Sequence, residues 1–464
     1  MIWDHIIKNG TIVTPHETYK ANIYIYNGKI SAISRELLEG DAKEVTDAKG
    51  LYVLPGLIDV HVHSRDPGPT HKEDFYFSSM AAAAGGITTI FEMPNTTPPT
   101  NTVENFNNQV RNLSSKAHVD FGIWAISLGN LNIHEIEGLH QAGAIGFKFF
   151  WGYAINKETY QLVYNYSSDM EDIISPPDEG DIYYIFEEVA KTGKTLAIHA
   201  ENHELIQGLS KKADINDNSY KKFLKSRPHL AEETTIQTAI SFARELGTKL
   251  HILHLTTKEG VKLIQEAQAK GYNISTETCP QYLFLTDENY EDIGAKMKVY
   301  PLIKNQQDQD MLWEGIRKKV ISIVCSDHAP HTKDEKTGDL WSIPAGMCGV
   351  ETLVPMMIDA VNNGEVTLNE LAALLSENPA KQFDIFPQKG SLQVGTDADI
   401  TIIDLEKKHT LKEDLLHSKS KITAFDGWEV KGMPVQTILR GKTIMKDGEV
   451  IGNQTGKFVN PNSI

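Results

Sequence analysis

Six residues whose side chains bind metal ions or transfer protons recur at comparable places in the middle of the chain. His61 and His63 end the apolar run LIDVHVH (57–63), and because alternate residues of a strand point to the same side, both rings face one side. The other four lie in or at the end of later apolar runs: Lys148, His199, His254 and Asp327. Imidazole and carboxylate groups are suitable ligands for zinc and similar divalent ions. A lone histidine in an apolar run is more often a core residue, but six such residues favour a metal site.

Lys148 is the unusual member of this set, because an ammonium group buried among metal cations would be strongly destabilising. A deprotonated amine that reacts with CO2 gives a carbamate, which is an anion able to bridge two metal ions. The alternative is that Lys148 pairs with a carboxylate at the mouth of the barrel. Beside four histidines and an aspartate, the carbamate is the favoured interpretation.

The apolar runs that carry these residues alternate with segments whose apolar spacing, near 3.6 residues, is typical of amphipathic helices. Strands buried on both faces, as in parallel sheets, are this apolar. The runs are LIDVHVH (57–63), GITTIFEM (86–93), VDFGIWAIS (119–127), AIGFKFF (144–150), KTLAIHAE (194–201), KLHILHLT (249–256), YNISTETC (272–279) and VISIVCSDH (320–328). About eight such units over roughly 270 residues predict a (β/α)8 barrel, whose active site lies at the C-terminal ends of its strands. A doubly wound open sheet is the alternative, but no glycine-rich phosphate motif follows the first run.

The two ends of the chain have a different pattern, with short β-rich runs separated by turn signals. Asn9-Gly10 and Asn27-Gly28 are typical hairpin turns, and β-rich runs return at 397–405 and 435–450. We therefore predict an α/β protein of two domains. Residues 54–387 form a TIM-like (β/α)8 barrel, and residues 1–53 and 388–464 together form a small β-sandwich domain.

One acidic segment interrupts the alternation of strands and helices. YNYSSDMEDIISPPDEGDIYY (164–184) contains Pro176-Pro177 and follows the fourth apolar run. It predicts a loop, which is either a lid over the site or a solvated excursion.

Composition excludes several classes of function. The 464 residues are 40% hydrophobic and 23% charged, and the 45 Lys and Arg against 62 Asp and Glu give a formal charge of −17. This balance argues against non-specific nucleic-acid binding and against a polybasic membrane anchor. The chain contains no run of about 18 apolar residues and no recognisable signal peptide, and its 3 cysteines cannot form a disulfide framework. We expect a cytoplasmic protein with a small-molecule substrate and neither nucleic acid nor a membrane as partner.

Seven motifs together resemble the cyclic amidohydrolases, a group that includes dihydroorotase, allantoinase, and hydantoinase or dihydropyrimidinase. The motifs are PGLIDVHVHSRDPG (55–68), EMPNTTPPT (92–100), GFKFF (146–150), HAEN (199–202), HLTTKEG (254–260), TETCP (276–280) and SDHAPHT (326–332). The resemblance implies two divalent metal ions, usually zinc, and a dimer or tetramer of identical chains. One ion would be held by His61, His63, Lys148 and Asp327, and the other by Lys148, His199 and His254.

The resemblance also implies a mechanism in which Asp327 is the catalytic residue. Water between two cations has its pKa lowered towards about 7. Asp327 would accept the proton of this water as hydroxide attacks a ring amide carbonyl, and would then return it to the leaving nitrogen. The alternative is that Asp327 is a ligand only.

The residues expected to contact the substituent of the ring favour dihydroorotase. A free carboxylate on the substrate needs an arginine or several hydrogen-bond donors. Arg65, Asn95 and His331 match positions that dihydroorotases use for this purpose. We therefore expect reversible hydrolysis of L-dihydroorotate to N-carbamoyl-L-aspartate, a step of pyrimidine biosynthesis.

Two features favour allantoinase or hydantoinase as the alternative. These enzymes have lysine where Lys148 stands, whereas many bacterial dihydroorotases have aspartate, and FFWGY (149–153) is similar to the hydantoinase pattern in which the residue matching Tyr153 contacts substrate. A hypothesis of a different class is a non-catalytic, hydantoinase-like scaffold. Such scaffolds have lost metal ligands, and the presence of all six ligand-type residues argues against it.

Overall fold

The computed structural model describes residues 2–163, 166 and 170–463. The apolar runs of the middle of the chain form parallel strands in two hydrogen-bonded groups, ordered β6-β7-β8 and β9-β10-β14-β15-β16-β17. Their bounds are β6 (Leu57–Val62), β7 (Ile87–Glu92), β8 (Asp120–Ile123), β9 (Ala125–Ile126), β10 (Phe147–Phe150), β14 (Thr195–His199), β15 (Lys249–Ile252), β16 (Ile274–Thr278) and β17 (Ile323–Val324). Each of the eight predicted runs contains one of these strands, and the run at 119–127 contains the consecutive strands β8 and β9.

Backbone contacts close these strands into a barrel. A parallel bridge joins Val62, at the end of β6, to His328, just after β17. The His63 amide donates to the His328 carbonyl at 2.7 Å, and the His328 amide donates to the His61 carbonyl at 3.2 Å. The prediction of a (β/α)8 barrel is therefore confirmed.

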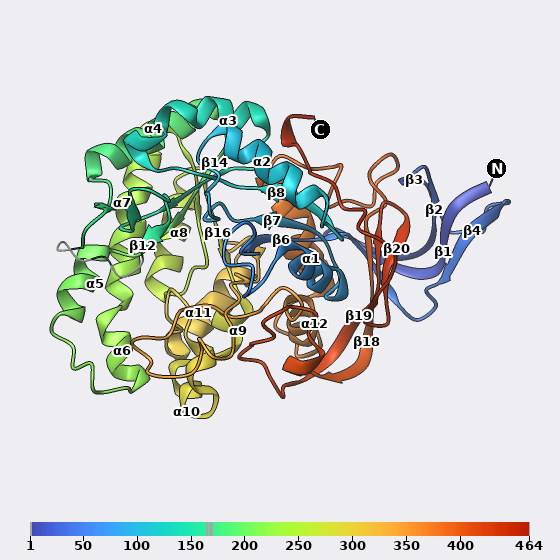
Figure 1. Cartoon of the computed structure of the whole chain (residues 1–464). Helices are drawn as coiled ribbons and strands as arrows, with labels where there is room; N and C mark the ends of the chain where they lie inside the picture. The colour runs from blue at the N-terminus through green and yellow to red at the C-terminus, as the bar shows by residue number, and fades with distance from the viewer. Residues whose placement is uncertain (1, 164–165, 167–169, 464) are drawn as a thin grey trace.

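Helices surround the strands and cover their outer faces (Figure 1). Apolar side chains of both layers form one large core, in which every residue of β6, β7, β10 and β14 is buried. The helices are α1 (Phe75–Ala84), α2 (Val103–Ser114), α3 (Ile136–Ala142), α4 (Glu179–Thr192), α5 (His203–Ser210), α6 (Tyr220–Ser226), α7 (His229–Leu246), α8 (Lys258–Ala269), α9 (Pro280–Phe284), α10 (Tyr290–Ile293), α11 (Gln306–Arg317), α12 (Leu353–Asn362), α13 (Leu368–Ala372) and α14 (Asn378–Gln382). Strands buried on both faces need such helical cover, which explains their uniformly apolar sequences.

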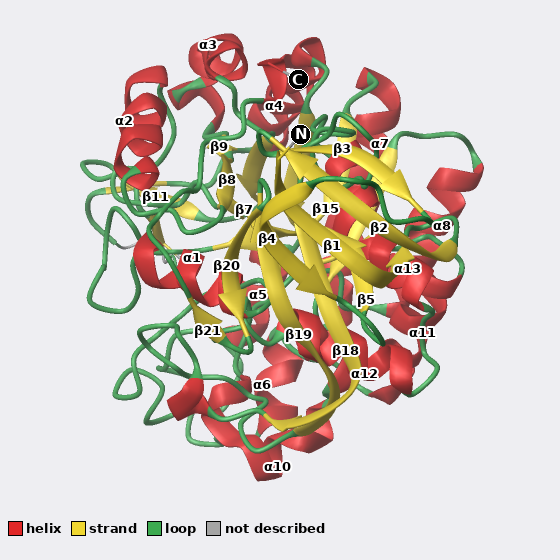
Figure 2. Cartoon of the chain, turned by 90° about the vertical axis from the view of Figure 1, so that its right-hand side faces the viewer, coloured by secondary structure: helices red, strands yellow, loops and turns green. Residues whose placement is uncertain are grey.

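The two ends of the chain form one sheet of nine strands beside the barrel (Figures 1 and 2). Strands β5 and β18 pair antiparallel, with Ile402 opposite Val53, and an apolar core separate from that of the barrel includes Ile12, Ile23 and Ile438. The strands are β1 (Ile2–Val13), β2 (Thr18–Tyr26), β3 (Lys29–Ser34), β4 (Asp41–Asp47), β5 (Tyr52–Pro55), β18 (Ile400–Thr410), β19 (Glu429–Leu439), β20 (Lys442–Lys446) and β21 (Glu449–Val450). The terminal β domain is thus confirmed as a product of both ends, while its boundaries at 53 and 388 stay a prediction.

The acidic segment predicted as a loop has regular structure in part. Ile173–Ile174 (β13) and Leu162–Val163 (β12) flank Ala154–Asn156 (β11) in a small antiparallel sheet. Helix α4 begins at Glu179, where the Asp178 carboxylate accepts a hydrogen bond from the Asp181 amide. The prediction of a loop is therefore wrong from residue 179 onward, because Asp178 is a favourable N-cap. Residues 164–165 and 167–169 lie outside the described residues, so the choice between lid and excursion stays open.

No helix in the described ranges is both long and apolar enough to cross a membrane. The three cysteines, Cys279, Cys325 and Cys348, are buried and free.

Candidate active site

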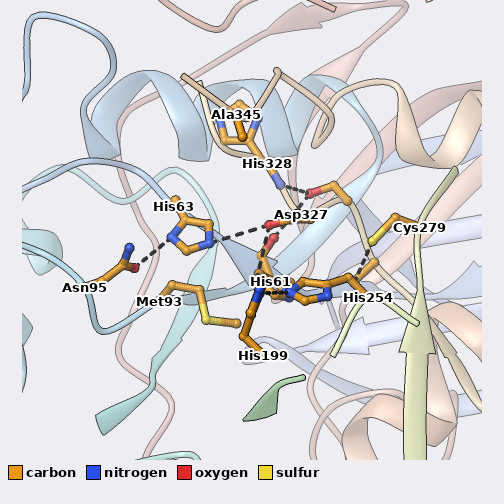
Figure 3. A network of polar contacts seen from close by, with 12 residues as sticks. His61, His63, Met93, Asn95, His199, His254, Cys279, Asp327, His328 and Ala345 are labelled. Atoms are coloured by element: carbon orange, nitrogen blue, oxygen red, sulfur yellow. Dashed lines mark hydrogen bonds and ion pairs between the residues drawn. The ribbon is translucent and has the colours of Figure 1, made fainter. Parts of the chain in front are cut away.

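A cavity of about 400 Å³ opens at the C-terminal ends of the barrel strands. All ten predicted site residues line it: His61, His63, Arg65, Asn95, Lys148, Tyr153, His199, His254, Asp327 and His331. In Figure 3, the labelled members of this set converge from separate strands and loops: His61, His63, Asn95, His199, His254 and Asp327. The structure therefore brings together every residue that the sequence singled out, and their individual roles stay predictions.

Two histidines and one carboxylate form the first half of this centre. The Asp327 Oδ1 atom lies 3.2 Å from His61 Nε2 and 3.5 Å from His63 Nε2. The far side of each ring is held by another residue, since His61 Nδ1 lies 2.6 Å from Glu277 Oε1 and His63 Nδ1 lies 2.8 Å from Asn95 Oδ1 (Figure 3). Both Nε2 atoms are thereby directed at the cavity.

Lys148, His199 and His254 form the second half. Lys148 Nζ lies 3.1 Å from His61 Nε2, and His199 Nδ1 lies 3.0 Å from His254 Nε2. The His61 and His254 rings are 5.4 Å apart between centroids, so the two halves share one small space. Buried His254 Nδ1 has no hydrogen-bond partner in the described part of the chain.

Burial shifts the pKa values of these groups toward their uncharged forms. It lowers the pKa of His61 to about 4 and holds the pKa values of His63 and His254 well below their ordinary value. Burial also lowers the pKa of the Lys148 ammonium and raises the pKa of the Asp327 carboxyl. Neutral imidazoles and an amine that loses its proton easily are the forms that bind metal ions and react with CO2.

Three residues of the site have a backbone conformation that is uncommon outside glycine. The φ angles of Arg65, His254 and Asp327 are 63°, 35° and 48°. Such left-handed conformations cost roughly 1–3 kcal/mol each and concentrate at functional sites. Here they occur where the chain leaves a strand and turns its side chain back toward the cavity.

Two buried glutamates that the sequence analysis did not single out hold the histidine rings. The Glu277 carboxylate bridges His61 and His251, and although burial opposes ionisation, these rings hold the pKa of Glu277 well below its usual range. Glu201 lies 3.0 Å from His199 Nε2 and 2.6 Å from an Arg227 nitrogen. The available signal was an acidic residue in each of two apolar runs: Glu201 in 194–201 and Glu277 in 272–279.

Arg65 and His331 form a cationic corner of the cavity. Lys72 Nζ lies 3.2 Å from His331 Nδ1 and Ala345 O lies 3.0 Å from His331 Nε2, so this ring accepts from the lysine and donates to the carbonyl. An Arg65 nitrogen lies 3.3 Å from the same Nε2. Burial and these cations lower the pKa of His331 to about 2, so the positive charge beside this neutral ring is that of Arg65 and Lys72.

Tyr153 lies on the opposite flank of His199 from His254. Its hydroxyl is 3.1 Å from His199 Nε2, and it lines the cavity. A phenol in this position suits donation to an oxygen that gains negative charge.

The donor set fits divalent metal ions. His61, His63 and Asp327 supply three ligand atoms within 4.8 Å of one another, and the facing nitrogens of His199 and His254 lie 3.0 Å apart. Carboxylate and neutral imidazole are ligands of catalytic zinc. The contacts of Glu277 with His61 and of Glu201 with His199 match the outer contacts that orient metal-binding histidines.

The chain is similar to known enzymes over nearly its whole length. A model of the amidohydrolase family matches residues 52–444. The chain is 36% identical over 465 residues to an L-hydantoinase of Paenarthrobacter aurescens, covering 99% of this chain and 98% of that protein. It is 36% identical over 463 residues to an allantoinase of Rubrobacter xylanophilus, with 99% and 98% covered. A solved L-hydantoinase (dihydropyrimidinase) from Arthrobacter aurescens superimposes with a TM-score of 0.92 at 35% identity, covering 99% and 100%.

These similarities support the cyclic amidohydrolase group but not dihydroorotase as its nearest member. The relatives above are named as hydantoinase and allantoinase, which was the alternative interpretation. Arg65, Asn95 and His331, which are expected to contact a ring substituent, favoured dihydroorotase, whereas Lys148 and the FFWGY motif with Tyr153 favoured hydantoinase and allantoinase.

Proposed function

The chain belongs to the amidohydrolase family and hydrolyses C–N bonds of cyclic amides, and from this premise we propose that its substrate carries a hydantoin-type ring. Such a ring is a five-membered cyclic urea with one further amide carbonyl. Allantoin and 5-substituted hydantoins both contain it. Water adds its hydroxyl to the ring carbonyl carbon and a proton to the ring nitrogen, and the ring opens to a carbamoylated amino acid.

The observation that carries this proposal is the convergence of six ligand-type residues on one cavity of a chain that resembles hydantoin-ring hydrolases over its whole length. The cavity of about 400 Å³ is small enough to enclose a single ring with its substituent. Lys148, for which the sequence resemblance implies a carbamate bridge, has its Nζ 3.1 Å from His61 Nε2 in the first half of the centre.

We propose that His61, His63, Asp327 and carboxylated Lys148 hold one divalent ion and that Lys148, His199 and His254 hold the other. Zinc is the ion that this donor set favours. When bound, the two ions supply Lewis-acid chemistry: they lower the pKa of a water molecule and polarise the ring carbonyl.

The chain's own residues orient the substrate and move one proton. Asp327 Oδ accepts the proton of the attacking water and returns it to the leaving ring nitrogen. The Tyr153 hydroxyl donates to the carbonyl oxygen as negative charge develops on it. Arg65 and Asn95 contact the polar groups at the other end of the substrate.

Turnover of a panel of rings by the zinc-loaded protein tests the proposal. The panel contains hydantoin, L- and D-5-benzylhydantoin, allantoin, dihydrouracil and L-dihydroorotate. We expect at least one hydantoin-type ring to be hydrolysed with a kcat/KM at least tenfold above that for dihydroorotate. Efficient dihydroorotate hydrolysis with negligible cleavage of every hydantoin-type ring would overturn the substrate class.

Metal analysis of the same protein tests the scaffold hypothesis. We expect about two ions per chain under metal-replete conditions. Absence of bound metal together with absence of turnover would support a non-catalytic scaffold instead. Light scattering on the same sample checks the proposed dimer or tetramer.

A further inference from the structure

An irregular segment that follows His331 forms one wall of the cavity. Residues 342–346 line it in sequence, and Glu335 lines it from the beginning of the same segment. No helix or strand contains these residues, so side-chain contacts must hold the wall in place.

The first of these contacts comes from Lys298, which lines the cavity together with Tyr300. Its ammonium donates to the Leu340 carbonyl at 2.7 Å and to the Ile343 carbonyl at 2.5 Å. The same group lies 4.9 Å from the centre of the Phe223 ring and 5.6 Å from that of Tyr300. Lys298 therefore binds the backbone of the wall while its ammonium group also faces two aromatic rings.

The second contact comes from Lys336, inside the segment itself. Its ammonium donates to the Lys298 carbonyl at 2.9 Å and to the Pro344 carbonyl at 3.1 Å. The Gly346 amide donates to the same Lys298 carbonyl at 2.9 Å. The two lysines thus tie three carbonyls of the wall, those of residues 340, 343 and 344, to one another and to residue 298.

Burying the ammonium groups of Lys298 and Lys336 costs free energy. Lys298 is 2% and Lys336 5% exposed, and neither ammonium is within ion-pair distance of a carboxylate among the described residues. Burying an unpaired charge costs free energy that an apolar side chain of the same shape would avoid. Gly346 adds a second constraint, because its φ is 135° and a Cβ there would lie 2.3 Å from the Ala329 carbonyl oxygen.

We propose that residues 340–346 form the wall that selects the substituent of the ring, and that Lys298 and Lys336 are the positioning residues that fix its shape. This inference rests on the proposed function. The lining side chains of the wall are those of Ser342, Ile343, Pro344 and Ala345, which carry no charge and are mostly apolar. The wall therefore fits an apolar substituent, and Arg65 offers the contact for polar ones.

Lys336→Met is the decisive variant, because Lys336 does not line the cavity. Lys333→Met makes the same substitution at an exposed position of the same segment and is the control. For the zinc-loaded variants we expect kcat for unsubstituted hydantoin to stay within threefold of wild type. The ratio of KM for L-5-benzylhydantoin to KM for hydantoin should rise at least tenfold in Lys336→Met and be unchanged in Lys333→Met.

Two further variants separate positioning from general stability. Lys336→Arg keeps a cationic donor and should restore at least part of the KM ratio. Ile343→Ala shortens a side chain of the wall itself and should change the ratio in the same way even where Lys336→Met fails to fold. The inference would be overturned if the KM ratio stayed within twofold of wild type in both Ile343→Ala and Lys336→Met. Where Lys336→Met does not fold, an unchanged KM ratio in Ile343→Ala alone would overturn it.

Hydrogen exchange tests the contacts of Lys336 with the wall without requiring turnover. Amides of residues 340–346 should exchange at least tenfold faster in Lys336→Met than in Lys333→Met, and unchanged exchange would overturn the role of Lys336. Dissociation constants of the two rings, measured by calorimetry, apply the selectivity test even to an inactive protein. A wild-type protein that hydrolyses no ring contradicts the proposed function, whereas an active protein whose selectivity ignores the wall contradicts only this inference.

Discussion

At the scale of single residues, burial shifts the pKa values of the candidate ligands toward their uncharged forms, and neighbouring side chains fix the orientation of three histidine rings. Glu277 holds His61, Asn95 holds His63 and Glu201 holds His199. Each contact fixes which ring nitrogen faces the cavity. The rings are therefore ordered as ligands before any ion binds.

Asp327 is the residue on which proton transfer depends. Asp327→Asn retains an oxygen near His61 and His63 but cannot accept a proton, so kcat should fall by about 10²–10⁴-fold or more at every pH. Steady-state kinetics on hydantoin and elemental analysis of the metal check this together. Turnover within tenfold of wild type at equal metal content would show that Asp327 is a ligand only.

Arg65 is expected to act on binding of polar substituents rather than on chemistry. Loss of a hydrogen bond to a charged group costs about 1.5–3 kcal/mol, so Arg65→Met should raise KM for hydantoin-5-acetate about 10–100-fold and leave hydantoin within threefold. Initial-rate kinetics on both rings measure this. Arg111→Met, an exposed arginine on α2, is the control, and equal effects of the two variants would remove Arg65 from the site.

At the scale of elements, the strands of the barrel supply the reactive groups and the segments after them supply selectivity. Metal-ligand candidates lie on or just after β6, β10, β14, β15 and β17. The wall at 340–346 has no ladder of its own, and two buried lysines hold it instead. These lysine contacts lie outside the hydrogen-bond ladders of the barrel strands.

The buried ammonium group of Lys336 makes the free energy of unfolding depend on pH. Burial, and then the Lys298 cation, lower the pKa of Lys336 from 10.5 to about 7. Between these values the unfolded chain binds more protons than the folded one, so wild type should gain stability relative to Lys336→Met as pH rises, by at most about 1.4 kcal/mol per unit. Urea unfolding at pH 7, 8 and 9 measures the slope. Lys333→Met keeps the buried Lys336 and should have the slope of wild type. Equal slopes for wild type and Lys336→Met would contradict the burial of this charge.

At the scale of the whole molecule, a buried ionic cluster joins the barrel to the terminal sheet. Lys389 Nζ lies 2.5 Å from Asp120 of β8, 2.6 Å from Asp399 and 3.0 Å from Asp397, which both precede β18. Arg440, just after β19, also pairs with Asp120. The sheet is therefore attached to the barrel by charge as well as by apolar packing.

Removing the central cation of this cluster should destabilise the protein strongly. Lys389→Met leaves three buried carboxylates without their main partner, which costs about 3–5 kcal/mol. Lys29, which is 45% exposed and also pairs with Asp397, is the control, since Lys29→Met should cost no more than about 1 kcal/mol. Urea and thermal denaturation measure both. Similar midpoints for the two variants would show that the cluster does not join the two parts.

The sequence by itself predicted the barrel, the terminal β domain and ten of the residues that line the cavity. Six of the ten stand out because parallel strands buried on both faces must be apolar, which makes a polar residue in a run, such as His199 or Lys148, conspicuous. The other four came from the resemblance to the cyclic amidohydrolases. The start of α4 at Glu179 was missed, because the proline-rich acidic segment before it resembles a solvated loop.

Only the tertiary structure decided what lies around those residues. Glu277 is 216 positions from His61, and Lys298 is 42 positions from Leu340, so neither pairing leaves a local pattern. The cavity wall has no periodic signal, because its shape is set by lysine contacts with carbonyls of irregular backbone. Local spacing fixes which residues share a strand end, whereas selectivity depends on contacts between segments that are distant in the chain.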